Sequence, residues 1–352
     1  MKILYGVQGT GNGHIARARE ILPALNKRAS VDVLVSGTHN ELHLEHPIQY
    51  KAGGLGFHFG KNGSFDLIGT WKSSDVKRFF RELEALDLSS YDLVINDFEP
   101  VSAWAARKQG VPCVGLSNQL ALLDPLIPRP KTAGLGRVFP RLMRHYAPTD
   151  AAYALHYLPR EPFTFSPLIA RECRELAIGD KGHYLVYLPF YSDREIIKAL
   201  KRFREVQWKV FSKHTKSSYR YSNIDFEPIQ RSRFLQALGD CRGVLAAAGF
   251  GISSEALFLG KKLLLLPMKA QYEQRFNAHV LKMYFGVESI KSLKRKYMQT
   301  IQHWLNQDCE VQVNYKDNAQ DIVDQILTDF ANQAYLASEA SELIFDRGKA
   351  KL

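Results

Sequence analysis

The chain has 352 residues, of which 45% are hydrophobic, 11% aromatic and 24% charged. This length favours two domains of roughly 150–180 residues, and the composition excludes a disordered or collagen-like chain. Lysine and arginine number 47 against 36 acidic residues, which gives a net charge of +11. Such an excess favours anionic partners, whether nucleotides, nucleic acid or an acidic membrane surface.

No apolar run approaches the roughly 20 residues that cross a bilayer. The N-terminal sequence MKILYGVQGTGNGH becomes glycine-rich where a signal peptide would have its apolar core. We therefore expect a cytoplasmic protein. Its four cysteines, at positions 113, 173, 241 and 309, have no metal-ligand or redox spacing, so we expect reduced thiols and no structural zinc.

Short apolar runs alternate with helical segments through the first half of the chain. This order favours a parallel, doubly wound sheet. The stretch His39–Thr70 is glycine-rich and has no clear assignment. Strands are predicted over Lys2–Val7, Val31–Val35, Tyr91–Asn96 and Val111–Leu116, and helices over His14–Arg28, Asp75–Leu88 and Glu99–Gln109.

Between Leu120 and Arg174 the pattern weakens and prolines recur, which places a domain crossover around residues 160–180. The alternation then restarts, with strands over Tyr184–Leu188, Gln207–Phe211, Arg242–Ala247 and Lys262–Leu266, and helices over Asp193–Arg204, Arg231–Leu238, Ile252–Leu259 and Glu273–Met283. We predict two Rossmann-like α/β domains facing across a cleft, each with a doubly wound parallel sheet. They span residues 1–165 and 175–315, and helices over 316–352 are expected to pack back on the domain junction.

A glycine-rich turn joins the first predicted strand to the first helix. Its candidate residues are Gly9, Gly11, Asn12, Gly13 and His14. Glycines allow a close approach of a ligand to the backbone, and a helix N-terminus favours an anion or a polar group. The turn is neither a dinucleotide fingerprint, whose third glycine would fall on His14, nor a P-loop. The His14 imidazole either takes a proton from a hydroxyl or caps the helix.

A second strand-to-helix turn contains Gly249, Gly251, Ser253, Ser254 and Glu255. Its backbone amides and the two serine hydroxyls would hold a diphosphate at the positive end of the helix. The Glu255 carboxylate would accept hydrogen bonds from ribose hydroxyls. The alternative is a glutamate that the helix dipole alone favours at this position.

Four polar residues follow the next predicted strand, namely Gln271, Glu273, Gln274 and Asn277. Their donors and acceptors suit a ligand with many hydroxyls, such as a sugar, and the alternative is a solvated helix face. Both turns open at the carboxyl edge of one sheet, where α/β proteins bind ligands.

With these three motifs, the sequence resembles the GT-B glycosyltransferases. The residues that carry the resemblance are G-T-G-N-G-H, A-G-x-G-x-S-S-E-A-L-x-L-G-K and P-x-x-x-Q-Y-E-Q-x-x-N-A. The chain is similar to the peptidoglycan enzyme that adds N-acetylglucosamine to lipid I, and to the UDP-glycosyltransferases. The resemblance implies an inverting, metal-independent transfer of a sugar from a nucleotide-sugar, with UDP as the nucleotide, to an acceptor hydroxyl. It implies no cofactor and no metal.

The resemblance also assigns roles to residues. His14 matches the histidine base, Glu255 the residue that holds the ribose, and Glu273 with Gln274 the pair that contacts the sugar hydroxyls. Gly249, Ser253 and Ser254 match the diphosphate loop, although Ile252 stands where the peptidoglycan enzyme has threonine. In plant-type members an aspartate orients the histidine. Here that residue is Asp97 or Glu99, and either could instead cap the following helix.

A basic, partly apolar stretch contains Arg129, Lys131, Arg137, Arg141 and Arg144. It is consistent with peripheral docking on an anionic membrane and with a lipid-linked or cell-envelope acceptor; the alternative is an ordinary surface helix. A second basic run, Lys291–Lys296, is interpreted as a solvated face. No nucleic-acid-reading module is visible, so we expect no nucleic-acid partner.

Two other functions fit the same fold. A UDP-sugar 2-epimerase would form its product from the nucleotide-sugar alone, without an acceptor. A non-catalytic regulator would bind the nucleotide-sugar through Glu255 and turn nothing over.

Overall fold

The computed structural model describes residues 1–37, 44–55, 76–130, 142–160, 162–269, 271–308 and 311–332. These residues form two compact units. Unit 1 contains the described residues up to Ala170 together with those from Lys316 onward, and unit 2 contains Arg171–Tyr315.

Unit 1 is built on a parallel sheet with the strand order β3-β2-β1-β4-β5-β6-β7. From β1 the chain winds first toward β3 and then, from β4, in the other direction, so the topological switch point lies between β1 and β4. The strands are β1 (Lys2–Gln8), β2 (Ser30–Ser36), β3 (Tyr50–Ala52), β4 (Leu93–Asp97), β5 (Cys113–Ser117), β6 (Ala151–Leu155) and β7 (Thr164–Phe165).

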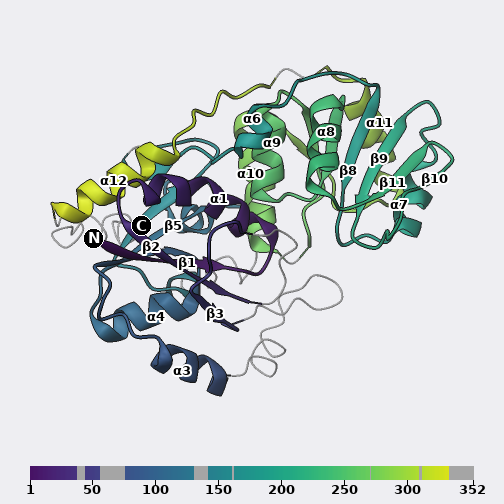
Figure 1. The fold of residues 1–352 in the computed structure, drawn as a ribbon. Coiled ribbons are helices and arrows are strands. Elements are labelled where there is room, and N and C mark those ends of the chain that lie inside the picture. Colours follow the sequence, from purple (N-terminus) through teal and green to yellow (C-terminus); the bar gives the residue numbers. More distant parts are fainter. Residues whose placement is uncertain are drawn as a thin grey trace, which may run out of the picture. The chain divides into compact units, whose positions relative to one another are not determined.

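Helices cover both faces of this sheet (Figure 1). On one face, Phe79 and Leu83 pack with Leu4 and Val94 in a buried cluster. Strands buried on both faces are apolar throughout, which is why β1 and β4 read as continuous apolar runs. The helices of unit 1 are α1 (Asn12–Asn26), α3 (Val76–Ala85), α4 (Pro100–Gln109) and α12 (Ala319–Ala331), with a 3₁₀ helix η1 (Asn118–Leu123).

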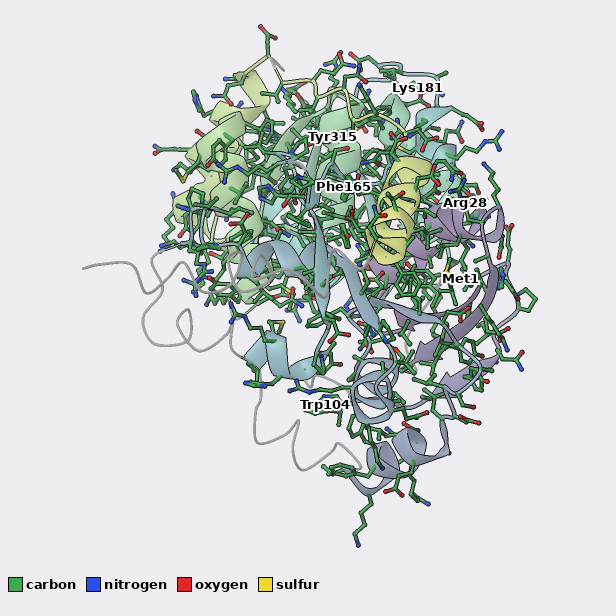
Figure 2. All side chains as sticks on the ribbon, turned by 90° about the vertical axis from the view of Figure 1, so that its left-hand side faces the viewer. Met1, Arg28, Trp104, Phe165, Lys181 and Tyr315 are labelled. Carbon is green, nitrogen blue, oxygen red and sulfur yellow. The ribbon has the colours of Figure 1, made fainter. Side chains whose placement is uncertain are left out.

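The C-terminal helix α12 belongs to unit 1, where it packs against α1. Arg28, just beyond α1, forms an ion pair of 3.3 Å with Asp324 of α12 (Figure 2). The Tyr153 hydroxyl of β6 donates a hydrogen bond to Asp329. These contacts join α12 to α1 and to the sheet of unit 1.

Unit 2 repeats the plan, with the strand order β10-β11-β9-β8-β12-β13-β14. All its neighbouring strands are parallel except the β10–β11 pair. Its strands are β8 (His183–Tyr187), β9 (Gln207–Ser212), β10 (Tyr219–Tyr221), β11 (Ile224–Pro228), β12 (Gly243–Ala246), β13 (Lys262–Leu265) and β14 (Glu288–Ser289). Its helices are α6 (Arg171–Arg174), α7 (Asp193–Leu200), α8 (Arg231–Asp240), α9 (Phe250–Phe258), α10 (Tyr272–Phe285), η2 (Arg295–Tyr297) and α11 (Met298–Asn306).

The two faces of this second sheet carry different helices. Val186 and Val210 point into a cluster with residues of α7 and α11. Their neighbours Tyr187 and Phe211 point to the opposite face, where both rings contact Phe234 of α8. Helices α9 and α10 lie on the α8 side (Figure 1), as right-handed crossovers from β12 and β13 require.

The predicted fold class is confirmed, because both units contain Rossmann-like sheets of mainly parallel strands. Six strands and two helices were not predicted from the sequence, namely β3, β6, β7, β10, β11, β14, α6 and α11. Strand β7 and the hairpin strand β10 are three residues or shorter, and β6 lies in the proline-rich stretch that hid its apolar pattern. The predictions at residues 38–43, 56–75 and 131–141 lie outside the described residues.

No helix within the described part of the chain is both long and apolar enough to cross a membrane.

Candidate active site

The glycine-rich turn of unit 1 joins the carboxyl end of β1 to α1. The Gly9 amide donates a hydrogen bond of 2.6 Å to the Ser36 carbonyl oxygen of β2, and a Cβ at Gly9 would lie only 2.8 Å from that oxygen. Gly11 precedes α1 with φ of 94°, which favours glycine. Asn12 begins the helix. A Cβ at Gly13 would meet no described atom within 4 Å. The first turn of α1 therefore has neither a capping side chain nor bulky neighbours at Gly13.

His14 lies in this first helical turn and is 8% exposed. Its Nδ1 atom is 2.9 Å from Oδ1 of Asp97, the last residue of β4. Strands β1 and β4 are parallel neighbours in which Val7 pairs with Asp97, so both side chains come from the same edge of the sheet. The contact lies at the topological switch point, where open α/β sheets bind ligands.

Arg17 completes this cluster, and the sequence analysis did not find it. Its Nε donates to Asp97 Oδ2 at 2.8 Å and its Nη2 donates to Asp97 Oδ1 at 2.7 Å, a two-pronged ion pair. Its Nη1 donates to the Asn118 side-chain oxygen at 2.9 Å, at the end of β5. The available signal was the helical spacing, because residues 14 and 17 lie on the same face of a helix.

Asp97 is fully buried, yet it is held as a carboxylate. Burial alone would raise its pKa, but the charges of Arg17 and His14 and their hydrogen bonds hold the pKa below its ordinary value. The Arg17 side chain is itself only 6% exposed. A buried ion pair of this geometry fixes the position of its members, because each charge depends on the other for compensation.

Glu99 has a different role from Asp97. Its carboxylate accepts hydrogen bonds from the backbone amides of Val101 at 2.7 Å and Ser102 at 2.6 Å, and so caps α4. Burial raises the pKa of Glu99, although the hydrogen bonds from Ser102 act against this. Of the two candidate partners of His14, the structure therefore places Asp97 in contact and Glu99 at the helix cap.

We expect Glu99→Ala to destabilise the protein by about 1–2 kcal/mol, because two amides of α4 lose their acceptor. Turnover of the folded variant should stay close to that of the wild type, since the Glu99 carboxylate is bonded to amides of α4 whereas His14 contacts Asp97. Urea unfolding and turnover on the same preparation check both expectations. A large loss of turnover with unchanged stability would contradict the capping role.

The second turn leads from β12 into α9 in unit 2. Gly249 is the N-cap residue without a capping side chain, and Gly251 in the first turn is exposed. The first amides of a helix have no acceptor within it, so this end presents N–H groups toward a ligand. Both serine hydroxyls lie inside. Ser254 donates to the Phe250 carbonyl oxygen at 2.8 Å, and the buried Ser253 hydroxyl has no hydrogen-bond partner among the described residues.

Glu255 lies on the inner side of α9 and is 9% exposed. Its Oε1 accepts a hydrogen bond of 3.0 Å from Arg231 at the start of α8. Arg231 also donates to Glu172 at 3.2 Å. The sequence analysis missed Arg231, which lies 24 positions before Glu255. Arg231 thus holds the Glu255 carboxylate in position beside the turn between β12 and α9.

The four polar residues at the start of α10 divide into two pairs. Gln274 accepts a hydrogen bond from the Met268 amide at 2.9 Å, and Asn277 donates to the Ala248 carbonyl oxygen at 3.0 Å. Both are buried and tie α10 to the two turns. Gln271, the N-cap residue, and Glu273 are half-buried and remain accessible in part. Because β12 and β13 are parallel neighbours, these residues lie at the same sheet edge as Gly249.

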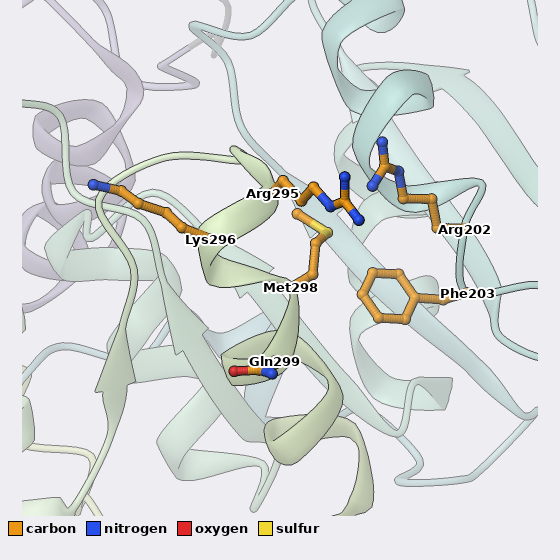
Figure 3. A pocket seen from close by; sticks show the side chains of 6 residues that line it. All are labelled: Arg202, Phe203, Arg295, Lys296, Met298 and Gln299. Carbon is orange, nitrogen blue, oxygen red and sulfur yellow. The ribbon is translucent and has the colours of Figure 1, made fainter.

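The hollow in Figure 3 has a volume of about 580 Å³ and lies elsewhere in unit 2. It adjoins α7 and α11, on the face of the sheet opposite α8, and it contains part of the basic run Lys291–Lys296. Its lining residues are Arg202, Phe203, Arg295, Lys296, Met298 and Gln299. The hollow therefore contributes nothing to the candidate site. Among the described residues, no group of His, Cys, Asp or Glu side chains is arranged to hold a metal ion.

Comparisons with known proteins identify the family. The sequence model of Glycosyl transferase family 1 matches residues 1–307. A search of curated proteins finds no match. Among solved structures, UGT2 of Phytolacca americana, complexed with UDP-2-fluoro-glucose and pterostilbene, is 13% identical with a TM-score of 0.58. That likeness covers 97% of this chain and 98% of that one.

A second similar structure is the glycosyltransferase SsfS6 of Streptomyces sp. SF2575, complexed with thymidine diphosphate. It is 16% identical with a TM-score of 0.55, covering 96% of this chain and 100% of that one. These likenesses support the GT-B fold, and the family match covers most of the chain, as the three sequence motifs indicated. The chain therefore belongs to Glycosyl transferase family 1 and is a glycosyltransferase of the GT-B fold.

Proposed function

We propose that this glycosyltransferase moves a sugar from a nucleotide-sugar to an acceptor hydroxyl, without a metal ion and with inversion at the anomeric carbon. The observation that carries the proposal is the contact of 2.9 Å between His14 Nδ1 and the buried carboxylate of Asp97. A histidine whose Nδ1–H is held by a carboxylate presents the lone pair of Nε2 to a substrate. Among the described residues, the hydrogen bonds of the His14 ring to Asp97 and Arg17 both involve Nδ1.

The reaction is a single displacement. As Nε2 of His14 takes the proton of the acceptor hydroxyl, the oxygen attacks the anomeric carbon from the side opposite the leaving group. The bond between this carbon and the diphosphate oxygen breaks, and the nucleoside diphosphate leaves with the electron pair. One displacement inverts the anomeric carbon.

Unit 2 would hold the donor. The amides of the uncapped first turn of α9 and the positive helix end would stabilise the charge that develops on the diphosphate, which makes a metal unnecessary. Glu255 would accept a hydrogen bond from the ribose. Because Gln271 and Glu273 are half-buried at the start of α10 whereas Gln274 and Asn277 are buried, we assign contact with the sugar hydroxyls to Gln271 and Glu273.

Two similar structures contain UDP-2-fluoro-glucose and thymidine diphosphate, which supports a nucleotide-sugar donor with a pyrimidine base. The first also contains pterostilbene, a small-molecule acceptor. We retain UDP as the preferred nucleotide. A lipid-linked or cell-envelope acceptor and a peripheral membrane contact remain proposals from the sequence, since Lys131, Arg137 and Arg141 lie outside the described residues.

Calorimetric titration with UDP, TDP, GDP and CMP, in magnesium and in a chelator, tests the donor site. We expect selective binding of one pyrimidine nucleoside diphosphate, equally tight in both buffers. Glu255→Ala should weaken this binding roughly 10- to 100-fold, the effect of losing a hydrogen bond to a charged group.

Glu172→Ala is the matched control, because it removes the other carboxylate that Arg231 contacts and should leave the affinity unchanged. Equal nucleotide affinity in wild type and Glu255→Ala would contradict the ribose assignment. No binding of any of the four nucleotides would contradict the donor class.

A further inference from the structure

Three side chains meet at one imidazole nitrogen in unit 1. The Nδ1 atom of His14 lies 2.9 Å from Asp97 Oδ1 and also 2.9 Å from Arg17 Nη2. A guanidinium only donates hydrogen bonds, and an ionised carboxylate only accepts them. A neutral imidazole nitrogen does one or the other, according to the tautomer. One of the two contacts is therefore unfavourable in either neutral form of His14.

The two tautomers have opposite consequences for the proposed reaction. With the proton on Nδ1, His14 donates to Asp97, opposes Arg17 and presents a basic Nε2 to the substrate. With the proton on Nε2, His14 accepts from Arg17, opposes Asp97 and has no lone pair for the acceptor hydroxyl. Arg17 thus competes with Asp97 for control of the same nitrogen.

We propose that Arg17 is a positioning residue that controls the tautomer of His14, an inference that rests on the proposed role of His14 as the base. Arg17 lies in α1, one turn after His14, and its contact with Asn118 fixes the guanidinium against η1. The guanidinium is thereby held where it competes with Asp97 for Nδ1 of His14.

Few other titratable groups face this cluster within unit 1. Tyr5 of β1 is fully buried, and burial together with the charge of Asp97 raises its pKa well above the ordinary value, so its hydroxyl stays neutral. Glu99 is engaged by the amides of α4. Changes in the tautomer of His14 can therefore be attributed to Arg17 and Asp97.

Nitrogen NMR of protein labelled with ¹⁵N-histidine tests the proposal without any substrate. In the wild type at high pH, the His14 nitrogens should report a mixture of the two tautomers. Arg17→Gln removes the charge and keeps an amide that can donate to Asp97. In this variant the Nδ1–H tautomer should predominate, because the imidazole then faces Asp97 without the competing guanidinium.

Arg17→Lys retains a cationic donor and should keep the tautomer mixture nearer to that of the wild type. Arg19→Met is the matched control, because it removes a cation from the same helix at a position that does not share a face with residues 14 and 17, and it should leave the mixture unchanged. A pure Nδ1–H tautomer in the wild type would overturn the proposal, and this readout needs no variant to fold. An unchanged tautomer mixture in folded Arg17→Gln would overturn it as well.

Kinetics separate this inference from the proposed function. The rate of nucleoside diphosphate release from the donor, with water or a hydroxyl compound as acceptor, should rise in Arg17→Gln through kcat and not KM, because more of His14 then presents a basic Nε2. Release at an unchanged kcat would refute the role of Arg17 alone. Absence of nucleotide binding would refute the proposed function, while the NMR result would still decide how Arg17 acts on His14.

Discussion

His14→Ala is expected to lower turnover about 100- to 10,000-fold, the usual contribution of a positioned general base. His14 contacts the protein through Nδ1 and lies in unit 1, whereas the proposed donor residues lie in unit 2. Nucleotide affinity should therefore be unchanged. The measurement is the rate of nucleoside diphosphate release at saturating donor, beside a calorimetric titration of the same sample.

Two variants control this experiment. His14→Gln keeps a donor toward Asp97 but has no titratable nitrogen, so it should be as inactive as His14→Ala. His183 of β8, whose Nε2 contacts the Ala237 carbonyl oxygen, belongs to unit 2, and His183→Gln should remain active. Full turnover in His14→Ala would remove histidine catalysis from the account.

Asp97→Ala should have the largest effect on folding. It removes the fully buried carboxylate that accepts hydrogen bonds from Arg17 Nε and Nη2 and takes away the negative charge that balances the guanidinium. Breaking one side of a buried ion pair costs about 3–5 kcal/mol. Replacing both members with apolar residues, as in Asp97→Leu combined with Arg17→Met, should recover much of this loss, because no charge then remains buried.

Urea unfolding at neutral pH measures this effect, with Asp97→Asn as the variant that preserves shape. The folded-state pKa of Asp97 lies below its unfolded value. Its stabilising contribution is therefore complete above the unfolded pKa near 4 and disappears as the pH falls through the folded value. The difference between wild type and Asp97→Asn should shrink in acid. A difference that grew in acid would mean that Asp97 is protonated in the native state.

The sequence predicted most of the strands because parallel strands covered on both faces are apolar along their whole length. It also located the turns that follow β1 and β12 from their glycines. In the turn after β1, Gly9 has no room for a Cβ and Gly11 has a positive φ. Strands β6 and β7 were missed because proline-rich connections interrupt the alternation on which the prediction relied.

The candidate site was predictable only where one residue carries the signal. His14 follows a glycine-rich turn, and Asp97 ends an apolar strand, so both are visible one at a time. Arg17 is not, because its importance comes from a carboxylate 80 positions away. The contacts of Asn118 and Arg231 are likewise tertiary.

Side-chain direction was a second source of uncertainty. Ser254 and Asn277 are polar residues next to a candidate ligand turn, which favoured contact with the ligand. The structure instead uses them for internal hydrogen bonds to backbone carbonyl oxygens. Buried polar groups need such partners, and a sequence does not show which partner they find.

The most direct test of the proposed function follows a nucleotide-sugar by NMR in the presence of the protein, a chelator and a set of hydroxyl acceptors. We predict that an α-linked donor such as UDP-glucose, or its thymidine counterpart, disappears as the nucleoside diphosphate and a β-linked product appear together. The result that would contradict the account is a donor that stays intact with every acceptor. A donor converted to its 2-epimer without an acceptor would contradict it equally.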